Sequence, residues 1–135
     1  MKTLGISLKA NRAIYVAIEG SEDDFQVINK GVFELKNSKD QSAIKAFHES
    51  WMTLINGGDY NAIAIKERIS KGRFAGGAIT FKMEGLIQLS DYEIQIVHGT
   101  RLKSKLKDHD PSFGKIHSYQ EEAARLAYYL LMINN

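Results

Sequence analysis

One carboxylate, Glu67, has the best position for chemistry in this sequence. It follows a short apolar run, 61–65, with the composition of a buried strand, and cations flank it at Lys66 and Arg68. In open α/β sheets, functional sites form where strands end and loops begin. Glu67 is therefore our first candidate for a catalytic or metal-binding acid. The alternative is a structural ion pair with a neighbouring cation, because paired acids also occur where there is no chemistry.

A loop rich in glycine and basic residues follows Glu67. It reads SKGRFAGGA over residues 70–78 and contains Lys71 and Arg73. Backbone N–H groups at the start of a helix, together with these two cations, can hold a phosphate. The loop is not a Walker motif, because it lacks the terminal Lys-Ser/Thr pair. The alternative is a closely packed turn between a strand and a helix, which also needs small residues.

A second basic stretch, RLKSKLK at residues 101–107, follows a predicted strand. Lys103 and Lys105 could contact phosphates there, although such a run is more often a solvated helix face. Residues 61–115 as a whole hold more Lys and Arg than Asp and Glu, which fits an anionic partner such as nucleic acid. The chain has no cysteine, so a disulfide and a thiolate metal site are both excluded.

The elements that must position these residues follow from the hydrophobic pattern. The predicted strands are 2–9, 13–19, 25–35, 61–67 and 92–97, and the predicted helices are 41–56, 74–89, 101–107 and 119–133. The first three strands form an antiparallel meander, and the fourth is parallel to the first because a helix crosses over between them. The pattern therefore predicts an α/β fold with a five-stranded mixed sheet flanked by helices, in the element order of the RNase H-like fold.

Several local details are also predicted. Gly31 is expected to form a bulge in the third strand. The helix 74–89 is apolar almost all round, so we expect it to be buried on most sides, with its small residues close to the sheet. Thr100 is expected to cap the next helix, and Ser118 with Glu121 forms a capping-box pattern before the last one.

The bulk composition bounds the class of protein. The chain has 135 residues, the length of one domain, and 44% hydrophobic residues, which support a globular fold. Together with the element order, this length leads us to expect a single RNase H-like domain over residues 1–135. No apolar run approaches the length of a membrane span, and the N-terminus lacks the apolar segment of a signal peptide. These observations predict a cytoplasmic protein with no membrane association.

Three stretches resemble the RuvC-type Holliday-junction resolvases. LGISLKANRAIYVAI is similar to that family's opening strand, hairpin and second strand, with Ser7 where the family has Asp. AIAIKERISKGRFAGGAITFKMEG is similar to the second motif, with Glu67 at the position of the motif's Glu. YQEEAARLAYYLL is similar to the final helix, with Glu122 and Arg125 at the two positions of the Asp-x-x-Asp pattern. The core KER-x-x-KG-x-F-AGGA also resembles that of a small, uncharacterised bacterial family.

The resemblance implies a nucleic-acid partner and a homodimer. In the resolvases, several carboxylates hold two divalent metals that activate water and stabilise the leaving oxygen. By the resemblance, Glu67 and Glu122 are candidate ligands of Mg²⁺ or Mn²⁺, and Ser7 is at most a weak neutral ligand. Arg125 places a cation where a ligand is expected, so the acidic centre is degenerate. Glu121 and Arg125 are also spaced for a helix ion pair, and whether Glu121 or Glu122 faces the site stays open.

Three functions are consistent with these observations. The first is a nucleic-acid-binding protein with a degenerate acidic centre. Its phosphate contacts would come from Lys66, Arg68, Lys71, Arg73, Lys103 and Lys105. The second is an active Mg²⁺- or Mn²⁺-dependent nuclease that acts on structured DNA or an RNA–DNA hybrid, with Glu67, Glu122 and Ser7 as catalytic residues. The third is a scaffolding or oligomerisation protein without enzymatic activity.

Overall fold

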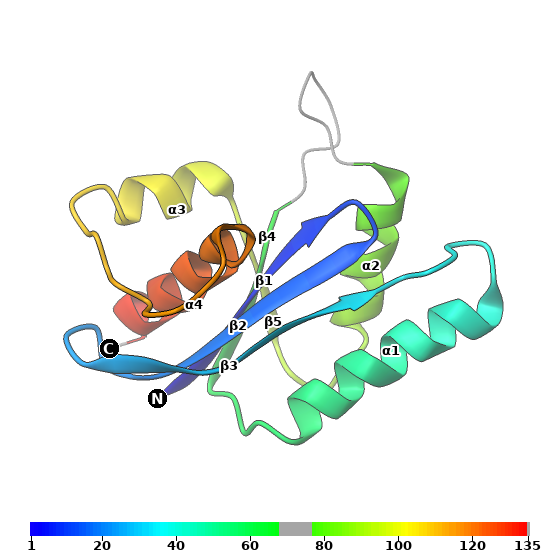
Figure 1. The fold of residues 1–135 in the computed structure, drawn as a ribbon, viewed down its shortest axis with the longest axis horizontal. Helices are drawn as coiled ribbons and strands as arrows, with labels where there is room; N and C mark the ends of the chain where they lie inside the picture. Colours follow the sequence, from blue (N-terminus) through cyan, green and yellow to red (C-terminus); the bar gives the residue numbers. More distant parts are fainter. Residues whose placement is uncertain (68–76, 135) are drawn as a thin grey trace.

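A computed structural model of the protein describes residues 1–67 and 77–134 and shows a five-stranded mixed sheet between helices (Figure 1). The strands are β1 (Lys2–Lys9), β2 (Arg12–Gly20), β3 (Phe25–Glu34), β4 (Ala62–Lys66) and β5 (Ile94–Val97). The helices are α1 (Gln41–Asn56), α2 (Ala78–Gln88), α3 (Gly99–Lys105) and α4 (Glu121–Ile133), with a 3₁₀ turn at Ser118–Gln120. The sheet order is β3-β2-β1-β4-β5, with β1, β2 and β3 antiparallel and β4 and β5 parallel to β1. The predicted fold class is confirmed.

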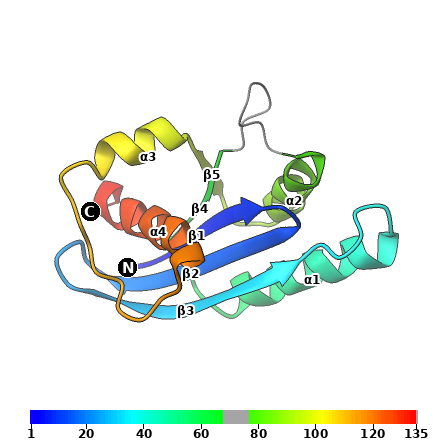
Figure 2. The same cartoon turned by 45° about the horizontal axis from the view of Figure 1, so that its top comes forward.

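Helices cover the sheet on both faces, as Figure 2 shows. One core lies against α1 and α2 and includes Leu4, Ile6, Phe47, Trp51 and Met83. The other lies against α3 and α4 and includes Ile14, Val16, Leu102, Leu126 and Leu130. The near-continuous apolar sequence of β1 fits this central position, because both faces of the strand are covered. None of the described helices has the length and apolar character needed to span a membrane.

Helix α4 packs directly against β1 at Gly5. A Cβ atom at Gly5 would overlap the carbonyl oxygen of Ala123 and lie 2.7 Å from the backbone nitrogen of Ala127. The hydroxyl of Thr3, on the same face of β1, donates to the Ala127 carbonyl at 2.8 Å. Glycine is therefore required at this crossing, which brings the first turn of α4 close to the end of β1.

Helix α2 is less buried than its sequence predicts. Its buried side chains are Thr80, Met83 and Ile87, and Leu89, just beyond the helix, is 61% exposed. A Cβ atom added at Gly85 would meet no atom within 4 Å. The expectation of a helix buried on most sides is wrong for its described part, because a helix lying on a sheet contacts it along one stripe. Residues 74–76 of the predicted helix lie outside the described residues.

The predicted bulge in β3 is displaced. The register between β2 and β3 shifts at Ile28, whereas Gly31 pairs regularly with Tyr15. A Cβ atom at Gly31 would lie 2.5 Å from the Tyr15 hydroxyl oxygen, so the Tyr15 side chain would have to move to admit one. Gly31 therefore lies against the Tyr15 side chain rather than in the bulge.

The caps of the last two helices also differ from the prediction. The N-cap of α3 is His98, whose Nδ1 accepts from the backbone N–H of Thr100 at 3.2 Å. Before α4, the Gln120 side chain accepts from the backbone N–H of His117 at 2.9 Å. The capping-box pattern predicted one residue further on is not used, because a 3₁₀ turn precedes α4.

Replacing Gly5 with Ala should destabilise the fold strongly, because the new methyl group would overlap backbone atoms of α4. We expect the free energy of unfolding, measured by urea denaturation, to fall by about 3 kcal/mol. The matched control is Gly85→Ala in α2, where space is available and the gain in helix propensity should stabilise by about 0.5–1 kcal/mol. Equal effects of the two substitutions would contradict the described crossing of α4 and β1.

Candidate functional site

The C-terminal ends of β1 and β4 lie side by side at one edge of the sheet. The last residues paired in parallel are Ile6 and Ile65, so Ser7 and Lys66 follow them at adjacent positions. Ile6 and Ile65 belong to the core against α1 and α2. Because side chains alternate along a strand, Ser7 and Lys66 face the opposite side, toward α4. The first turn of α4 adds Glu122 to this group.

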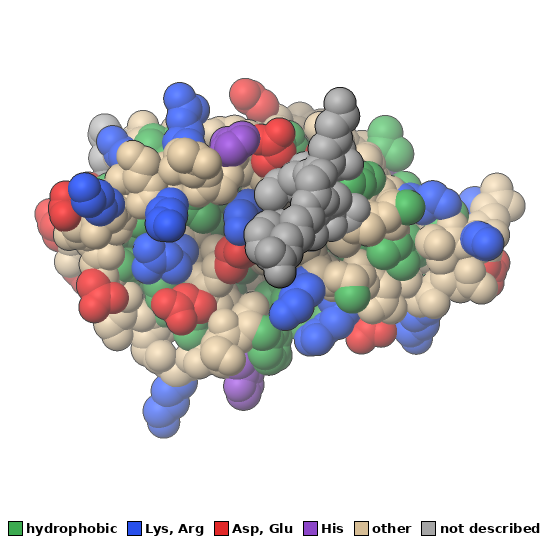
Figure 3. Space-filling model, turned by 90° about the horizontal axis from the view of Figure 1, so that it is seen from above, with side chains coloured by type: hydrophobic (Ala, Val, Ile, Leu, Met, Phe, Trp, Pro, Cys, Tyr) green, Lys and Arg blue, Asp and Glu red, His purple; other side chains and the backbone are tan. Residues whose placement is uncertain are grey.

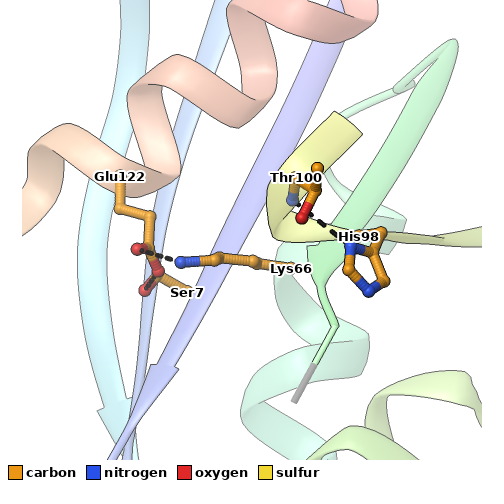
Figure 4. A network of polar contacts seen from close by, with 5 residues as sticks. All are labelled: Ser7, Lys66, His98, Thr100 and Glu122. Carbon is orange, nitrogen blue, oxygen red and sulfur yellow. Dashed lines mark hydrogen bonds and ion pairs between the residues drawn. The ribbon is translucent and has the colours of Figure 1, made fainter. Parts of the chain in front are cut away.

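Ser7, Lys66 and Glu122 form a hydrogen-bonded group, the strand-end cluster, shown in Figure 4. The Ser7 hydroxyl donates to Glu122 Oε1 at 2.6 Å, and the Lys66 ammonium donates to Glu122 Oε2 at 2.8 Å. Ser7 is buried, while the side chains of Lys66 and Glu122 are 31% and 39% exposed. Each carboxylate oxygen therefore has a donor from a different strand, so Glu122 connects β1, β4 and α4.

Glu67 has a different environment from Glu122. Its backbone N–H donates to the Val97 carbonyl at 2.8 Å and extends the pairing of β4 with β5. Its carboxylate lies 3.9 Å from Nε2 of His98, and both side chains are well exposed, at 46% and 67%. Because side chains alternate along a strand, it is Lys66, and not the next residue Glu67, that shares a face of the sheet with Ser7. Of the three predicted catalytic residues, the structure joins Ser7 to Glu122 and places Glu67 beside a histidine.

The acidic partner of Lys66 is a feature that sequence reasoning missed. The sequence predicted a phosphate contact for Lys66, and the structure gives it the Glu122 carboxylate. The alternation of side-chain direction along β4 could have predicted that Lys66 faces α4. Ala62 and Ala64 belong to the core beneath α4, so Lys66, two residues further on, has the same orientation.

The donors around Glu122 do not fit a divalent metal. Mg²⁺ and Mn²⁺ prefer several oxygen ligands, and carboxylates supply most of them in proteins. Here one carboxylate is shared between a hydroxyl and an ammonium, and the ammonium charge would repel a metal ion bound at the same oxygens. Within residues 1–67 and 77–134, no group of three or more His, Asp or Glu side chains could hold a metal ion. The metal roles of Glu67 and Glu122 stay predictions.

The cations predicted to contact nucleic acid fall into separate places. Three of them lie outside the described residues: Arg68, Lys71 and Arg73. Lys66 belongs to the strand-end cluster. Lys103 and Lys105 are exposed on α3, while Leu102 and Leu106 are buried against the core.

The residues of α4 beside the cluster resolve two open points. Glu121 is exposed and Glu122 bonds the strand ends, so Glu122 is the acid that faces the site. In the described part of the chain, Glu121 and Arg125 do not form the predicted ion pair.

The edge of the molecule seen in Figure 3 carries charges of both signs. Lys and Arg side chains are spread over the described part of this face, and Asp and Glu side chains are interspersed among them. The described surface in this view is therefore not one continuous basic face. An anion-binding site on it would come from a local group of cations.

The chain belongs to the family described as "Protein of unknown function (DUF3010)", whose model matches residues 1–130. No curated protein matches it in sequence. Among solved structures, Thermus thermophilus RuvC is similar, with a TM-score of 0.79, 11% identity, and coverage of 99% of this chain and 96% of that one.

Two further structures have similar folds. T. thermophilus RuvC in complex with Holliday junction substrate has a TM-score of 0.73 and 10% identity, covering 99% of this chain and 95% of that one. The yeast mitochondrial Holliday junction resolvase Ydc2 has a TM-score of 0.54 and 12% identity, covering 96% and 77% respectively. At these identities the likeness establishes the fold, which is the RNase H-like fold in its RuvC form.

The ion pair of Lys66 with Glu122 should show a small but measurable coupling energy. A double-mutant cycle with Lys66→Met and Glu122→Gln is expected to give about 0.5–1 kcal/mol by urea denaturation, because both side chains are partly exposed. The control cycle uses Lys2 and Glu19, whose charged atoms are 4.0 Å apart, and should give a value near zero. The same coupling in both cycles would argue against the described contact.

Proposed function

We propose that this member of the DUF3010 family binds structured nucleic acid and that its strand-end cluster does not support metal-dependent cleavage. The fold supports the first part, because one of the similar structures is RuvC in complex with a Holliday junction substrate. A fold alone does not determine an activity, so the second part depends on the residues of the site. Four-way DNA junctions are the first ligands to test.

The proposal depends mainly on the hydrogen-bonded ion pair between the Lys66 ammonium and the Glu122 carboxylate. Two-metal hydrolysis needs several acids that hold the metal ions close to the reacting phosphate. A lysine neutralises a carboxylate as a metal would, but it cannot coordinate water and lower its pKa. Ser7 offers a hydroxyl where the resolvase resemblance implies an acid. The cluster is therefore suited to fixing the strand ends and presenting positive charge.

The same lysine retains capacity for an anionic ligand. A lysine ammonium has three N–H donors, and the side chain of Lys66 is 31% exposed. A phosphate oxygen could accept from the ammonium at the exposed edge while Glu122 keeps its own contact. Contacts to phosphates position nucleic acid without reading its sequence. We therefore expect recognition of backbone and shape, with a strong dependence on salt.

The binding test uses the unaltered chain with labelled four-way junction, duplex, single strand and RNA–DNA hybrid. We expect junction affinity, measured by fluorescence anisotropy, to fall at least tenfold between about 50 and 200 mM salt, with the DNA intact in Mg²⁺ or Mn²⁺. Metal-dependent cleavage that is lost in Glu67→Gln would establish the nuclease instead. If none of the four ligands binds at low salt, the proposed function is wrong and the scaffolding function is favoured.

A separate experiment tests whether the cluster fails to support metal-dependent cleavage because it lacks acids, by introducing acids at positions 7 and 66. The double variant Ser7→Asp with Lys66→Glu should gain Mn²⁺ binding, because three carboxylates would then meet at the strand ends. At about 100 times the dissociation constant, Mn²⁺ should stabilise this variant by about 2.7 kcal/mol.

The neutral control for that test is Ser7→Asn with Lys66→Gln, which should show no Mn²⁺ effect on its melting temperature. Unaltered protein should likewise show none. Stabilisation of the unaltered protein by Mn²⁺, abolished by Glu122→Gln, would show that the lysine does not exclude the metal.

A further inference from the structure

We propose that a groove between α3 and α4 is a binding surface for the phosphate backbone of nucleic acid, with Arg101 and Lys105 as its principal contacts. This inference rests on the proposed function and assigns its main contact surface. The groove has a volume of about 1000 Å³. It is lined by His98, Thr100, Arg101, Ser104, Lys105, Tyr129 and Ile133. These lining residues include two permanent cations and no acid.

The short helix α3 separates its cations onto different faces. Arg101 and Lys105 are four residues apart, so they lie on one side of the helix, and both line the groove. Lys103 is two residues from each of them, points away from that side, and is not part of the lining. The sequence grouped Lys103 with Lys105, whereas the structure groups Lys105 with Arg101.

The two groove cations have no acidic partner in the described part of the chain. The ion pairs formed there involve Lys2, Lys66, His98 and His109, and none involves Arg101 or Lys105. Both residues are exposed. Unlike Lys66, which is paired with Glu122, they form no ion pair with a described acid, so they are accessible to an external anion.

The groove lies next to the strand-end cluster. A Cβ atom at Gly99, the first residue of α3, would lie 3.2 Å from Cε of Lys66. His98, which lines the groove, directly follows β5 and stands beside the end of β4, as Figure 4 shows. The Glu67 carboxylate lies 3.9 Å from Nε2 of His98 at this end, so the uncompensated cations of the groove are those further along α3, Arg101 and Lys105. A ligand held at the sheet edge could reach them from there.

The geometry fits a phosphodiester strand. Four residues of helix rise about 6 Å, and one strand of a duplex carries one charge per about 3.4 Å of its axis. Arg101 and Lys105 are therefore spaced to contact nearby phosphates of the same strand. The hydroxyls of Thr100 and Ser104 add neutral donors to the groove, of the kind that commonly contact phosphate oxygens. No base-reading group is required, so the surface is independent of sequence.

The test compares two double variants that remove the same charge. Arg101→Ala with Lys105→Ala removes the groove cations. Lys107→Ala with Lys115→Ala is the matched control, because both of its residues are exposed and neither lines the groove. Binding of a labelled four-way junction is measured by fluorescence anisotropy over a range of salt, after circular dichroism has shown that both variants fold as the unaltered chain does.

The groove variant should bind about tenfold or more weakly at about 100 mM salt and lower the slope of log affinity against log salt by about two. The control should lose less than about threefold in affinity. Equal losses of junction affinity in the two variants would show that only net charge matters, and would overturn the assignment of the groove as the binding surface. Unchanged junction binding by the groove variant would overturn the groove and leave the proposed function standing, whereas no binding by the unaltered chain would overturn both.

A third variant tests the groove without removing either cation. Ser104→Glu places an acid beside Arg101 and Lys105, so it should compete with phosphate and weaken junction binding by several fold. The control is Ser112→Glu, which adds the same charge at an exposed position on the 108–115 loop that lines a different pocket, against β3. Equal binding by these two variants would contradict the assigned surface.

Discussion

The contact of the Glu122 carboxylate with a hydroxyl from β1 and an ammonium from β4 determines what this site can do. Its contribution to stability is small, since a partly exposed ion pair is worth at most about 1 kcal/mol. The fold is instead held by the two cores on either side of the sheet and by the close crossing of α4 and β1 at Gly5. The carboxylate is thus placed by packing, and its partners define the electrostatics of the strand ends.

A single fold can support different chemistry at the same edge of the sheet. Parallel strands that end together gather their terminal side chains, and those side chains decide whether the edge holds metal ions or anions. In this chain the gathered residues are a hydroxyl, a carboxylate and an ammonium, with further cations on α3 nearby. The match to RuvC over almost the whole chain therefore establishes an architecture. The preference for phosphate binding over water activation is our proposal, and it depends on these local residues.

The sequence predicted the architecture well, because the order and period of hydrophobic residues determine which elements form. The meander, the crossover helix α1 and the parallel strands β4 and β5 are confirmed. Details that depend on packing were harder. Gly5 and Gly85 are both glycines in apolar segments, and only coordinates show that Gly5 meets α4 whereas Gly85 meets nothing.

The site was predicted in part. Ser7 and Glu122 were identified and are in contact. Glu67 follows the end of β4 and lies beside His98, while its neighbour Lys66 occupies the face of β4 next to Ser7. Motif alignment compares residue types along the chain, so it does not distinguish adjacent positions that point to opposite sides of a strand. The shared position of Arg101 and Lys105 in the groove was missed because the face of α3 that lines the groove depends on how α3 lies against α4.

The most direct test of the central claim is a crystal structure of the protein soaked in Mn²⁺, with anomalous scattering used to locate the metal. We expect Lys66 Nζ to remain at hydrogen-bond distance from Glu122 and no manganese peak to lie beside that carboxylate. A manganese ion bound to Glu122, with the lysine displaced toward solvent, would contradict this claim.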